Sequence, residues 1–495
     1  MNGKSKFVAV DLGASNGRVL VAGWDGARFQ LREVHRFGNG PVEVLGRLHW
    51  DVLGLWSEIR NGLARASAGG RPASIGVDAW GVDFALLDSA GALLSNPRHY
   101  RDPRTAGAPD RAYRIVAPET LYAVTGVQTM AINTLFQLFV MAESRDPQLD
   151  AAAILLPIPN LFSYWLGAEG IAEYTHATTT QCLDARARTW ADDLLGRLGI
   201  PSRIFPPLVA PGTVLGPVRA GVAADLGSGP PPRIVAVACH DTASAVGAIP
   251  GLDPASAFIS SGTWSLMGVE LAVPVITDEA RRAGFTNEGG LAGTTRFQKN
   301  LAGLWLVQEC RRQWRQEGLD REWDELLALA AVAEPFGAIV DPDAPELLAP
   351  PDMPAAIRAA CTRSGQRPPD GVGAIIRCCL ESLVLRYRAT LEDLERLLGR
   401  RIEVVRVVGG GSRNRLLCQL TADACGRPVV AGPAEATAMG NVMVQAIATG
   451  ELDDVAAGRA AIAASIDLDT YLPRPGGAWD AGLARQRALS EGVRA

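Results

Sequence analysis

The sequence has little excess charge of either sign, and it contains no long block of basic residues. Its 495 residues include 48 Lys and Arg against 53 Asp and Glu, which gives a formal net charge of −5. Proteins that bind nucleic acid usually concentrate basic side chains on one face. We therefore expect no nucleic acid and no anionic membrane surface among the partners. Phosphates of a small nucleotide are not excluded, because backbone N–H groups can bind them without Lys or Arg.

The sequence also lacks an unbroken apolar segment long enough to cross a membrane. Residues 151–168 carry no charged side chain, but Pro157 and Pro159 interrupt them. A strand over AAAILLPIP and a short helix over NLFSYWLG fit this segment better than a transmembrane helix. The opening residues MNGKSKFVAVDLG also lack the pattern of a secretory signal peptide. We therefore expect no membrane partner and a cytoplasmic protein.

Cysteine is sparse, with eight residues and no C-x-x-C pair. This pattern favours buried thiols in a reducing cytosol and does not predict a metal framework. The spacing leaves open a disulfide between Cys361 and Cys378.

Length and composition indicate a globular protein of two or three domains. The apolar content of 48% is ordinary for such a protein, and 495 residues are too many for one core. Residues 206–232 are rich in Pro and Gly, and residues 247–254 form a short polar link. We place a domain boundary in this link and expect domains over residues 1–250 and 251–495.

The most informative stretch is IVAVACHDTASAV, residues 234–246. An apolar run meets a polar cluster and then small residues, a pattern typical of a buried strand that ends where a helix begins. Ligands of open α/β sheets lie beyond the carboxyl ends of strands. We therefore interpret Asp241 as a general base. The alternative is that Asp241 only caps the helix, a common role of Asp.

Two segments share a strand–turn–strand pattern. The first, FVAVDLGASNGRVLVA at residues 7–22, places Asp11 before a turn rich in Gly, Ser and Asn. The N–H groups of such a turn can hold an anion, and Asp11 could hold a cation over bound phosphates, directly or through water. The second, AFISSGTWSLMGVE at residues 257–270, has Ser260 in place of the acid. Either could be a plain β-hairpin, but their likeness favours two phosphate-binding turns.

Residues 74–87, SIGVDAWGVDFALL, predict two strands joined by a turn at Trp80 and Gly81. Asp78 and Asp83 flank this turn. Carboxylates beside an aromatic ring suit a sugar, because the ring covers a C–H face and the acids accept hydroxyl hydrogens. We take Asp83 as a candidate ligand of a sugar hydroxyl; a solvated turn is the alternative.

Residues 402–426 predict a buried strand, three glycines and a helix, which we interpret as a shelf for adenine or ribose. A dinucleotide-binding fingerprint would need glycine at position 414, where this chain has Asn414. The hydroxyl-rich residues 174–180 predict a strand and turn. Apolar spacing predicts helices over 134–142, 297–308, 374–398 and 435–449.

Together these segments resemble the FGGY family of carbohydrate kinases. The strings that carry the resemblance are VAVDLGAS-x-GRV, VD-x-WGVDF, YRD-x-RT, EYT-x-ATTTQ, HDTASAV, SSGTWSLMG, TNEGG, KN-x-x-GLWL-x-Q and VVGGG-x-x-N. They run from about residue 7 to about residue 450. Asn16 and Asn160 depart from the usual family residues. The resemblance implies an α/β fold with two RNase H-like domains, of the actin/hexokinase type, around a catalytic cleft.

The resemblance also implies an ATP-dependent kinase of a ketose, with Mg²⁺ as cofactor. Asp241 would accept the proton of the attacking hydroxyl, and Asp11 would hold Mg²⁺, most simply through water. The ketose site would consist of Gly81, His240, Asp241, Thr242 and Asn300, to which we add Asp83. The residues that would contact ATP are Ala14, Ser15, Asn16, Gly17, Arg18, Thr263, Gln308 and Gly410.

Other classes of function fit less well. A sugar-binding regulator without catalysis is opposed by the intact Asp11, Asp241 and both turns. A dehydrogenase is opposed by the broken fingerprint. The sequence leaves open which ketose is used and what the oligomeric state is.

Overall fold

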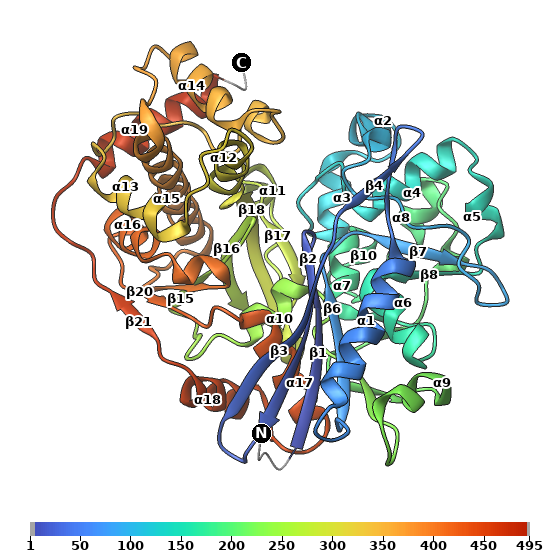
Figure 1. Ribbon diagram of the computed structural model, residues 1–495. Helices are drawn as coiled ribbons and strands as arrows, with labels where there is room; N and C mark the ends of the chain where they lie inside the picture. Colours follow the sequence, from blue (N-terminus) through green and yellow to red (C-terminus); the bar gives the residue numbers. More distant parts are fainter. Residues whose placement is uncertain (1–4, 493–495) are drawn as a thin grey trace. The chain divides into compact units, whose positions relative to one another are not determined.

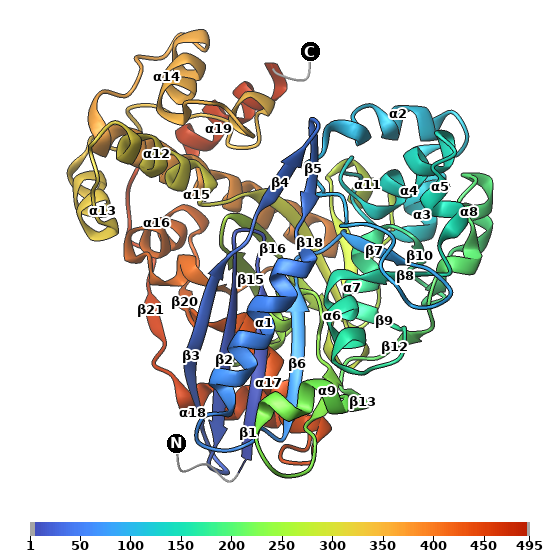
Figure 2. The ribbon, with the colours of Figure 1, turned by 45° about the vertical axis from the view of Figure 1, so that its right-hand side comes forward.

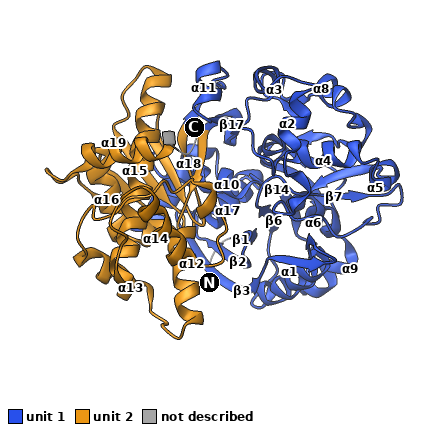
Figure 3. Ribbon diagram, turned by 90° about the horizontal axis from the view of Figure 1, so that it is seen from above, with its two compact units in different colours: residues 1–251, 270–297, 436–467 blue, residues 252–269, 298–435, 468–495 orange. Residues whose placement is uncertain are grey.

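The computed structural model describes residues 5–492. The chain forms two compact units that interleave along the sequence (Figure 3). Unit 1 comprises residues 1–251, 270–297 and 436–467; unit 2 comprises residues 252–269, 298–435 and 468–495. The division of the protein into domains over 1–250 and 251–495 stays a prediction.

A six-stranded mixed sheet is the centre of unit 1, with the strand order β13-β14-β6-β1-β2-β3. Figure 1 labels four of these strands, β6, β1, β2 and β3. β1 pairs in parallel with β6, and β6 with β14, whereas β1–β2, β2–β3 and β13–β14 are antiparallel. The expected strand–turn–strand at the start of the chain is thereby confirmed. The strands are β1 (Ser5–Leu12), β2 (Asn16–Trp24), β3 (Phe29–Gly38), β6 (Ser74–Ala79), β13 (Thr213–Pro217) and β14 (Arg233–Ala236).

Helices cover both faces of this sheet, so that β1 is almost entirely buried. On one face Val10 packs with Ile59 of α1 (Val52–Ser67), which lies along β2 and β3 (Figure 2). Side chains alternate along a strand, so Asp11 lies on the opposite face. There α17 (Ala436–Ala448) packs on β1 and β6.

The helix that carries Asp241 also packs on α17. This helix, α10 (Asp241–Gly247), follows β14 as the sequence predicts. The contact is close because Gly440 of α17 has no side chain: a Cβ atom there would lie 1.9 Å from the carbonyl oxygen of Ser244. α10 is thus fixed against the helix that covers the central strands.

The second sheet is also mixed and has the strand order β17-β18-β16-β15-β19-β20-β21. β15 and β16 form an antiparallel pair, which confirms the second strand–turn–strand, while β15–β19 and β19–β20 are parallel. The strands are β15 (Ser256–Ser261), β16 (Trp264–Leu271), β17 (Thr286–Gly289), β18 (Thr295–Ala302), β19 (Val404–Val408), β20 (Val429–Ala431) and β21 (Asp469–Tyr471).

Short strand pairs and further helices complete the units. The pairs are β4 (Pro41–Val44) with β5 (Arg47–Trp50), β7 (Phe84–Leu87) with β8 (Ile154–Pro157), β9 (Ala172–Glu173) with β12 (Leu208–Val209), and β10 (Leu183–Asp184) with β11 (Thr189–Trp190). Unit 1 also contains α2 (Ala108–Tyr113), α3 (Pro118–Thr125), α4 (Thr134–Glu143), α5 (Pro147–Ala151), α6 (Ile158–Leu166), α7 (Tyr174–Ala177), α8 (Asp192–Arg197), α9 (Ala220–Ala223), α11 (Asp278–Arg282) and α18 (Val455–Ser465). Unit 2 contains α12 (Trp305–Gln316), α13 (Trp323–Val332), α14 (Met353–Arg363), α15 (Gly371–Leu398), α16 (Arg415–Cys425) and α19 (Trp479–Gly492).

Most sequence-based elements are confirmed. The helices expected over 134–142, 374–398 and 435–449 are α4, α15 and α17, and Gly399 ends α15 in a left-handed conformation. The apolar segment 151–168 contains β8 and α6, and none of the helices between residues 5 and 492 is long and apolar enough to cross a membrane. All eight cysteines are buried free thiols, Cys361 and Cys378 included.

Two local predictions are wrong. Residues 297–302 belong to β18, and the helix predicted there begins only at Trp305. Gly303 lies between the strand and the helix. It packs directly on backbone, since a Cβ atom at this position would lie 2.5 Å from the carbonyl oxygen of Thr263. Residues 174–180 form α7 and a 3₁₀ turn rather than a strand, because Glu173 caps α7 with its carboxylate.

The close packing of α10 on α17 predicts that Gly440→Ala destabilises the protein. The added methyl group must displace the backbone of α10, and overpacking of this kind costs about 1–3 kcal/mol. Urea unfolding of the wild type and the variant measures this difference.

Gly196→Ala is the matched control, since Gly196 also lies in a helix but a Cβ atom there would meet nothing within 4 Å. We expect this variant to be unchanged or slightly more stable. Equal stability of the two variants would contradict the close contact at Gly440.

Candidate functional site

Asp241 is the first residue of α10 and stands just beyond the carboxyl ends of the parallel strands. A bridge between Ala79 and His240 joins this turn to the end of β6, where the N–H of Ala79 donates to the carbonyl of Cys239 at 2.9 Å. The N-cap position belongs to His240 and not to Asp241. A simple capping role therefore does not explain the carboxylate.

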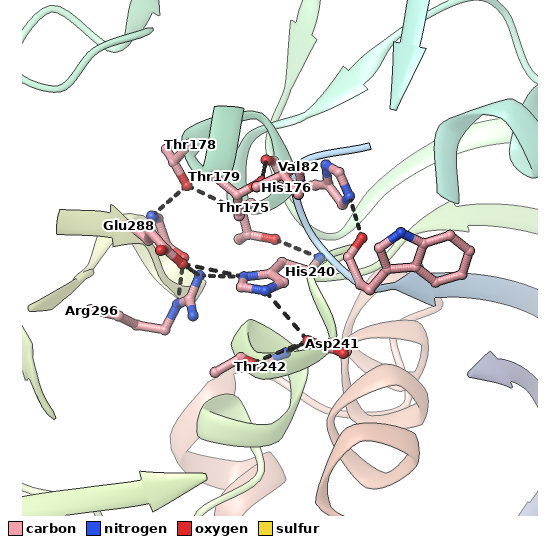
Figure 4. Close-up of polar contacts among 12 residues, drawn as sticks. Val82, Thr175, His176, Thr178, Thr179, His240, Asp241, Thr242, Glu288 and Arg296 are labelled. Atoms are coloured by element: carbon pink, nitrogen blue, oxygen red, sulfur yellow. Dashed lines mark hydrogen bonds and ion pairs between the residues drawn. The ribbon is translucent and has the colours of Figure 1, made fainter. Parts of the chain in front are cut away.

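The Asp241 carboxylate is held through one of its oxygens. Its Oδ1 accepts hydrogen bonds from the N–H and the hydroxyl of Thr242, and His240 Nε2 lies 3.4 Å from it (Figure 4). The side chain remains 30% exposed. One oxygen is thus fixed by the protein while the group stays accessible, as a base needs.

A buried carboxylate, Glu173, fixes the backbone in front of Asp241. It accepts hydrogen bonds from the N–H of Cys239 at 2.9 Å and from the N–H and hydroxyl of Thr175 at 2.8 and 2.6 Å. The N–H of His240 in turn donates to the Thr175 hydroxyl at 3.3 Å. Burial raises the pKa of Glu173 to about 6. We did not predict a role for Glu173, although it lies in the string EYT-x-ATTTQ.

The same segment supports the turn that carries Gly81. His176 Nε2 donates to the carbonyl of Trp80 at 2.9 Å, and the N–H of Val82 donates to the Thr179 hydroxyl at 3.1 Å. Gly81 packs directly on Thr179, since a Cβ atom at Gly81 would lie 3.1 Å from its hydroxyl. The rings of His176 and His240 lie 6.3 Å apart. Gly81 and His240 are therefore held by one helical segment.

Asp83 is buried and already satisfied by protein donors. Its Oδ2 accepts from the indole N–H groups of Trp50 and Trp80 at 2.6 and 3.0 Å and from the N–H of Tyr100 at 3.3 Å. Its Oδ1 accepts from the side-chain amide of Gln137 at 3.0 Å. Burial raises the pKa of Asp83 to about 6. These contacts give Asp83 a framework role, and direct contact with a sugar stays a prediction.

The first phosphate-binding candidate is the turn between β1 and β2. Ala14 and Ser15 lie in the turn, and Asn16, Gly17 and Arg18 begin β2. Asn39 supports the turn by donating its side-chain amide to the carbonyl of Gly13 at 2.7 Å. Gly17 is required by close packing, because a Cβ atom there would lie 2.2 Å from the ring of Phe37.

Two carboxyl groups lie next to each other at the end of this sheet. Asp11 and Asp78 are paired across the parallel strands β1 and β6, and Arg18 forms an ion pair with Asp11. Asp78 accepts a hydrogen bond from the side-chain amide of Asn441 at 2.5 Å. Burial, and then the charge of Asp11, raises the pKa of Asp78 well above its usual range. Its Oδ1 is buried and has no hydrogen-bond partner among residues 5–492.

The candidate ATP residues of unit 2 gather around the turn between β15 and β16. The hydroxyl of Thr263 donates to the Gln308 side chain at 3.2 Å. Gly411, next to Gly410, packs against Ser261 so closely that a Cβ atom would lie 2.1 Å from the serine hydroxyl. Thr263, Gln308 and the neighbour of Gly410 thus lie near one turn, and their contact with ATP stays a prediction. Asn300 lies on β18.

The chain matches both domain models of the FGGY family of carbohydrate kinases. Residues 7–247 match the N-terminal domain, and residues 257–449 match the C-terminal domain. The chain therefore belongs to this family, and the expected two-domain α/β fold of a carbohydrate kinase is confirmed.

Relatives are similar over nearly the full length. A rhamnulokinase of Bacteroides thetaiotaomicron is 46% identical, over 97% of this chain and 98% of the relative. A rhamnulokinase of Enterococcus faecalis is 41% identical, over 95% of each chain.

Solved structures share the fold at low sequence identity. The xylulose kinase of Lactobacillus acidophilus has a TM-score of 0.79 at 16% identity, over 99% of this chain and 98% of that chain. The glycerol kinase of Plasmodium falciparum with ADP has a TM-score of 0.79 at 14% identity, over 99% and 97%.

The buried His176 predicts a loss of stability at acid pH. Burial lowers the pKa of His176 from 6.5 to about 3 in the folded protein, so the unfolded chain binds the proton first as the pH falls. Stability is therefore lost below about pH 6.5, by about 1.4 kcal/mol per pH unit. Between about pH 6.5 and 5, the wild type should lose about 2 kcal/mol more than His176→Gln, whose amide can still donate to Trp80. Urea unfolding across this range tests the difference, and parallel losses would contradict it.

Proposed function

We propose that the chain transfers the γ-phosphate of ATP to the C1 hydroxyl of L-rhamnulose and forms L-rhamnulose 1-phosphate in L-rhamnose breakdown. The support for this substrate is the name of the relatives, which are 41–46% identical over nearly their full length. The observation that carries the chemistry is the partly exposed Asp241 carboxylate. In its described contacts the protein holds this group through Oδ1 alone.

Asp241 acts in this proposal as the proton acceptor. Oδ1 is held by Thr242, so Oδ2 takes the proton of the C1 hydroxyl as that oxygen attacks the γ-phosphorus. Positioned base catalysis is worth roughly 10²–10⁴-fold. The remaining acceleration comes from in-line positioning and from neutralising charge on the transferred group.

The ketose is bound, in the same proposal, by Gly81, His240, Thr242 and Asn300. The structure gives more support for three of these residues than for Asn300. α7 and the residues after it hydrogen-bond to the turns that carry Gly81, His240 and Thr242. Asp83 contributes by fixing the indoles of Trp50 and Trp80, whose rings lie 4.0 Å apart.

ATP is the phosphate donor that membership in a carbohydrate kinase family implies. We assign its phosphates to two turns. One comprises Ala14 and Ser15 with the following residues Asn16, Gly17 and Arg18; the other contains Thr263. Gln308 and Gly410 complete the set, with Gly410 at the start of a 3₁₀ turn that enters α16.

Mg²⁺ is the proposed cofactor, and the residues present fit it. Carboxylate oxygens are its preferred protein ligands, and it usually keeps several waters. Asp11 would hold the ion through water. The buried Oδ1 of Asp78, which has no partner within the described part of the chain, could accept a hydrogen bond from such a water. When bound, Mg²⁺ would neutralise negative charge on the phosphates.

A cytoplasmic location and closure of the two family domains around the substrates also belong to the proposal. The eight unpaired thiols are typical of a reducing compartment, and closure would keep water from the γ-phosphate. The alternatives are a kinase for L-fuculose or a pentulose, and a silent sugar-binding regulator.

The substrate is tested by measuring ADP release with ATP and Mg²⁺ across L-rhamnulose, L-fuculose, L-xylulose, D-xylulose and glycerol. We expect the highest kcat/KM with L-rhamnulose. Preference for another ketose would leave the family assignment intact and would show that the proposed substrate is wrong. Binding of a ketose in calorimetry without any turnover would favour the regulator.

Asp241→Asn tests the base. The amide keeps the size of the side chain but cannot accept the proton, so kcat should fall by roughly 10²–10⁴-fold while the ketose still binds. Single-turnover kinetics and calorimetry on the same preparation separate these effects. Near-normal turnover would remove Asp241 from the mechanism.

A further inference from the structure

The buried guanidinium of Arg296 contacts the ring of His240. Arg296 is on β18, and its side chain is 0% exposed. Its Nε donates to the carbonyl of Gly289 at 2.9 Å, and one terminal nitrogen donates to Glu288 at 3.1 Å and to His240 Nδ1 at 3.0 Å (Figure 4). Burying a guanidinium is costly, so a contact with an uncharged ring nitrogen calls for an explanation.

The contact determines which ring nitrogen of His240 carries the proton. A guanidinium has only donors, so the nitrogen that receives its hydrogen bond must offer a lone pair. That nitrogen is Nδ1, and in the neutral ring the proton is then on Nε2. Nε2 is the nitrogen that lies 3.4 Å from Asp241 Oδ1.

The other neutral tautomer, with the proton on Nδ1, would place two hydrogen-bond acceptors against each other. Without Arg296, a proton on Nδ1 could be donated to Glu288, whose Oε2 lies 3.3 Å from that nitrogen. Nε2 would then turn a lone pair toward the Asp241 carboxylate. Repulsion between the two would move the carboxylate out of position.

We propose that Arg296 and Glu288 are positioning residues that hold His240 with its proton on Nε2, facing Asp241. Glu288 compensates the buried charge of Arg296 and orients its guanidinium. The two donors of Thr242 then hydrogen-bond to Oδ1, and the proton on Nε2, whose nitrogen lies 3.4 Å away, turns positive charge toward the same oxygen. The remaining oxygen of Asp241 is left to accept the substrate proton, so the inference rests on the proposed function.

The proton position is measured directly in the wild type. With ¹⁵N-labelled histidine, long-range ¹H–¹⁵N correlation spectra at about pH 8 distinguish the two tautomers of each of the five histidines. The spectrum of His240→Gln assigns the signal. We expect the proton on Nε2. A proton on Nδ1 in the folded wild type overturns the proposal, whatever the activity.

Arg296→Met tests the cause. We expect the proton of His240 to move to Nδ1 and kcat to fall on the order of 10²-fold, the scale of a misplaced catalytic group, with little change in KM for ATP. If this variant does not fold, Arg296→Met combined with Glu288→Gln removes both charges of the buried ion pair, and the same result is expected. An unchanged tautomer in a folded variant overturns the proposal.

Arg377→Met is the matched control. Arg377 is also buried and donates to Glu381 at 2.6 Å, but it lies in unit 2. This variant should lose stability without moving the proton of His240. A shift of that proton here would show that any buried arginine has the effect, and would overturn the specific role of Arg296.

The outcomes for substrate and tautomer are independent. Turnover of a ketose other than L-rhamnulose, with the proton on Nε2, would change the proposed function and leave the positioning role intact. Efficient phosphorylation of L-rhamnulose with the proton on Nδ1 would do the reverse.

Discussion

The placement of Asp241 depends on a buried carboxylate that binds backbone instead of a cation. Glu173 receives the N–H groups of Cys239 and Thr175, and it thereby holds the last residues before α10 in one conformation. The free energy lost in burying the carboxylate is offset by these hydrogen bonds. Thr175 then bonds to the N–H of His240. A buried carboxylate beneath the strand end thus helps to set the direction of the turn that carries Asp241.

The central strands carry chemistry on one face only. Val10 faces α1 and the apolar core, whereas Asp11 and Asp78 face α17, where Asn441 meets Asp78 and Gln445 donates to the carbonyl of Val8 at 2.9 Å. Both carboxyl groups are buried, so each needs a polar partner or must be neutral. Arg18 of β2 fills that need for Asp11, and Asn441 of α17 donates to Asp78. A helix that covers the central strands therefore carries polar side chains on the face that meets them.

The sequence predicted those helices and strands whose hydrophobic period or glycine positions are visible within the segment itself. The two strand–turn–strand segments, the strand before Asp241 and the long helix α15 all follow from hydrophobic period and from glycine positions. The helical turns over 174–180 were not predicted from the hydrophobic pattern. They form because the Glu173 side chain caps the first turn and because Thr179 packs against Gly81. Arg296 and Glu288 were missed for the same reason: as charged residues in a strand they have no local signal, and only the tertiary contact with His240 gives them a role.

Because the units interleave along the sequence, unit 1 cannot complete its packing until late in synthesis. The helix with Asp241 occupies residues 241–247, but its packing partner, α17, is made only at residues 436–448. In a chain that emerges from the ribosome, the side of α10 that packs on α17 therefore stays uncovered until residues 436–448 have been made. Contacts between such distant segments slow folding and leave apolar surface open to aggregation. A nascent chain that ends before α17 would therefore carry Asp241, the proposed base, on a helix without its packing partner.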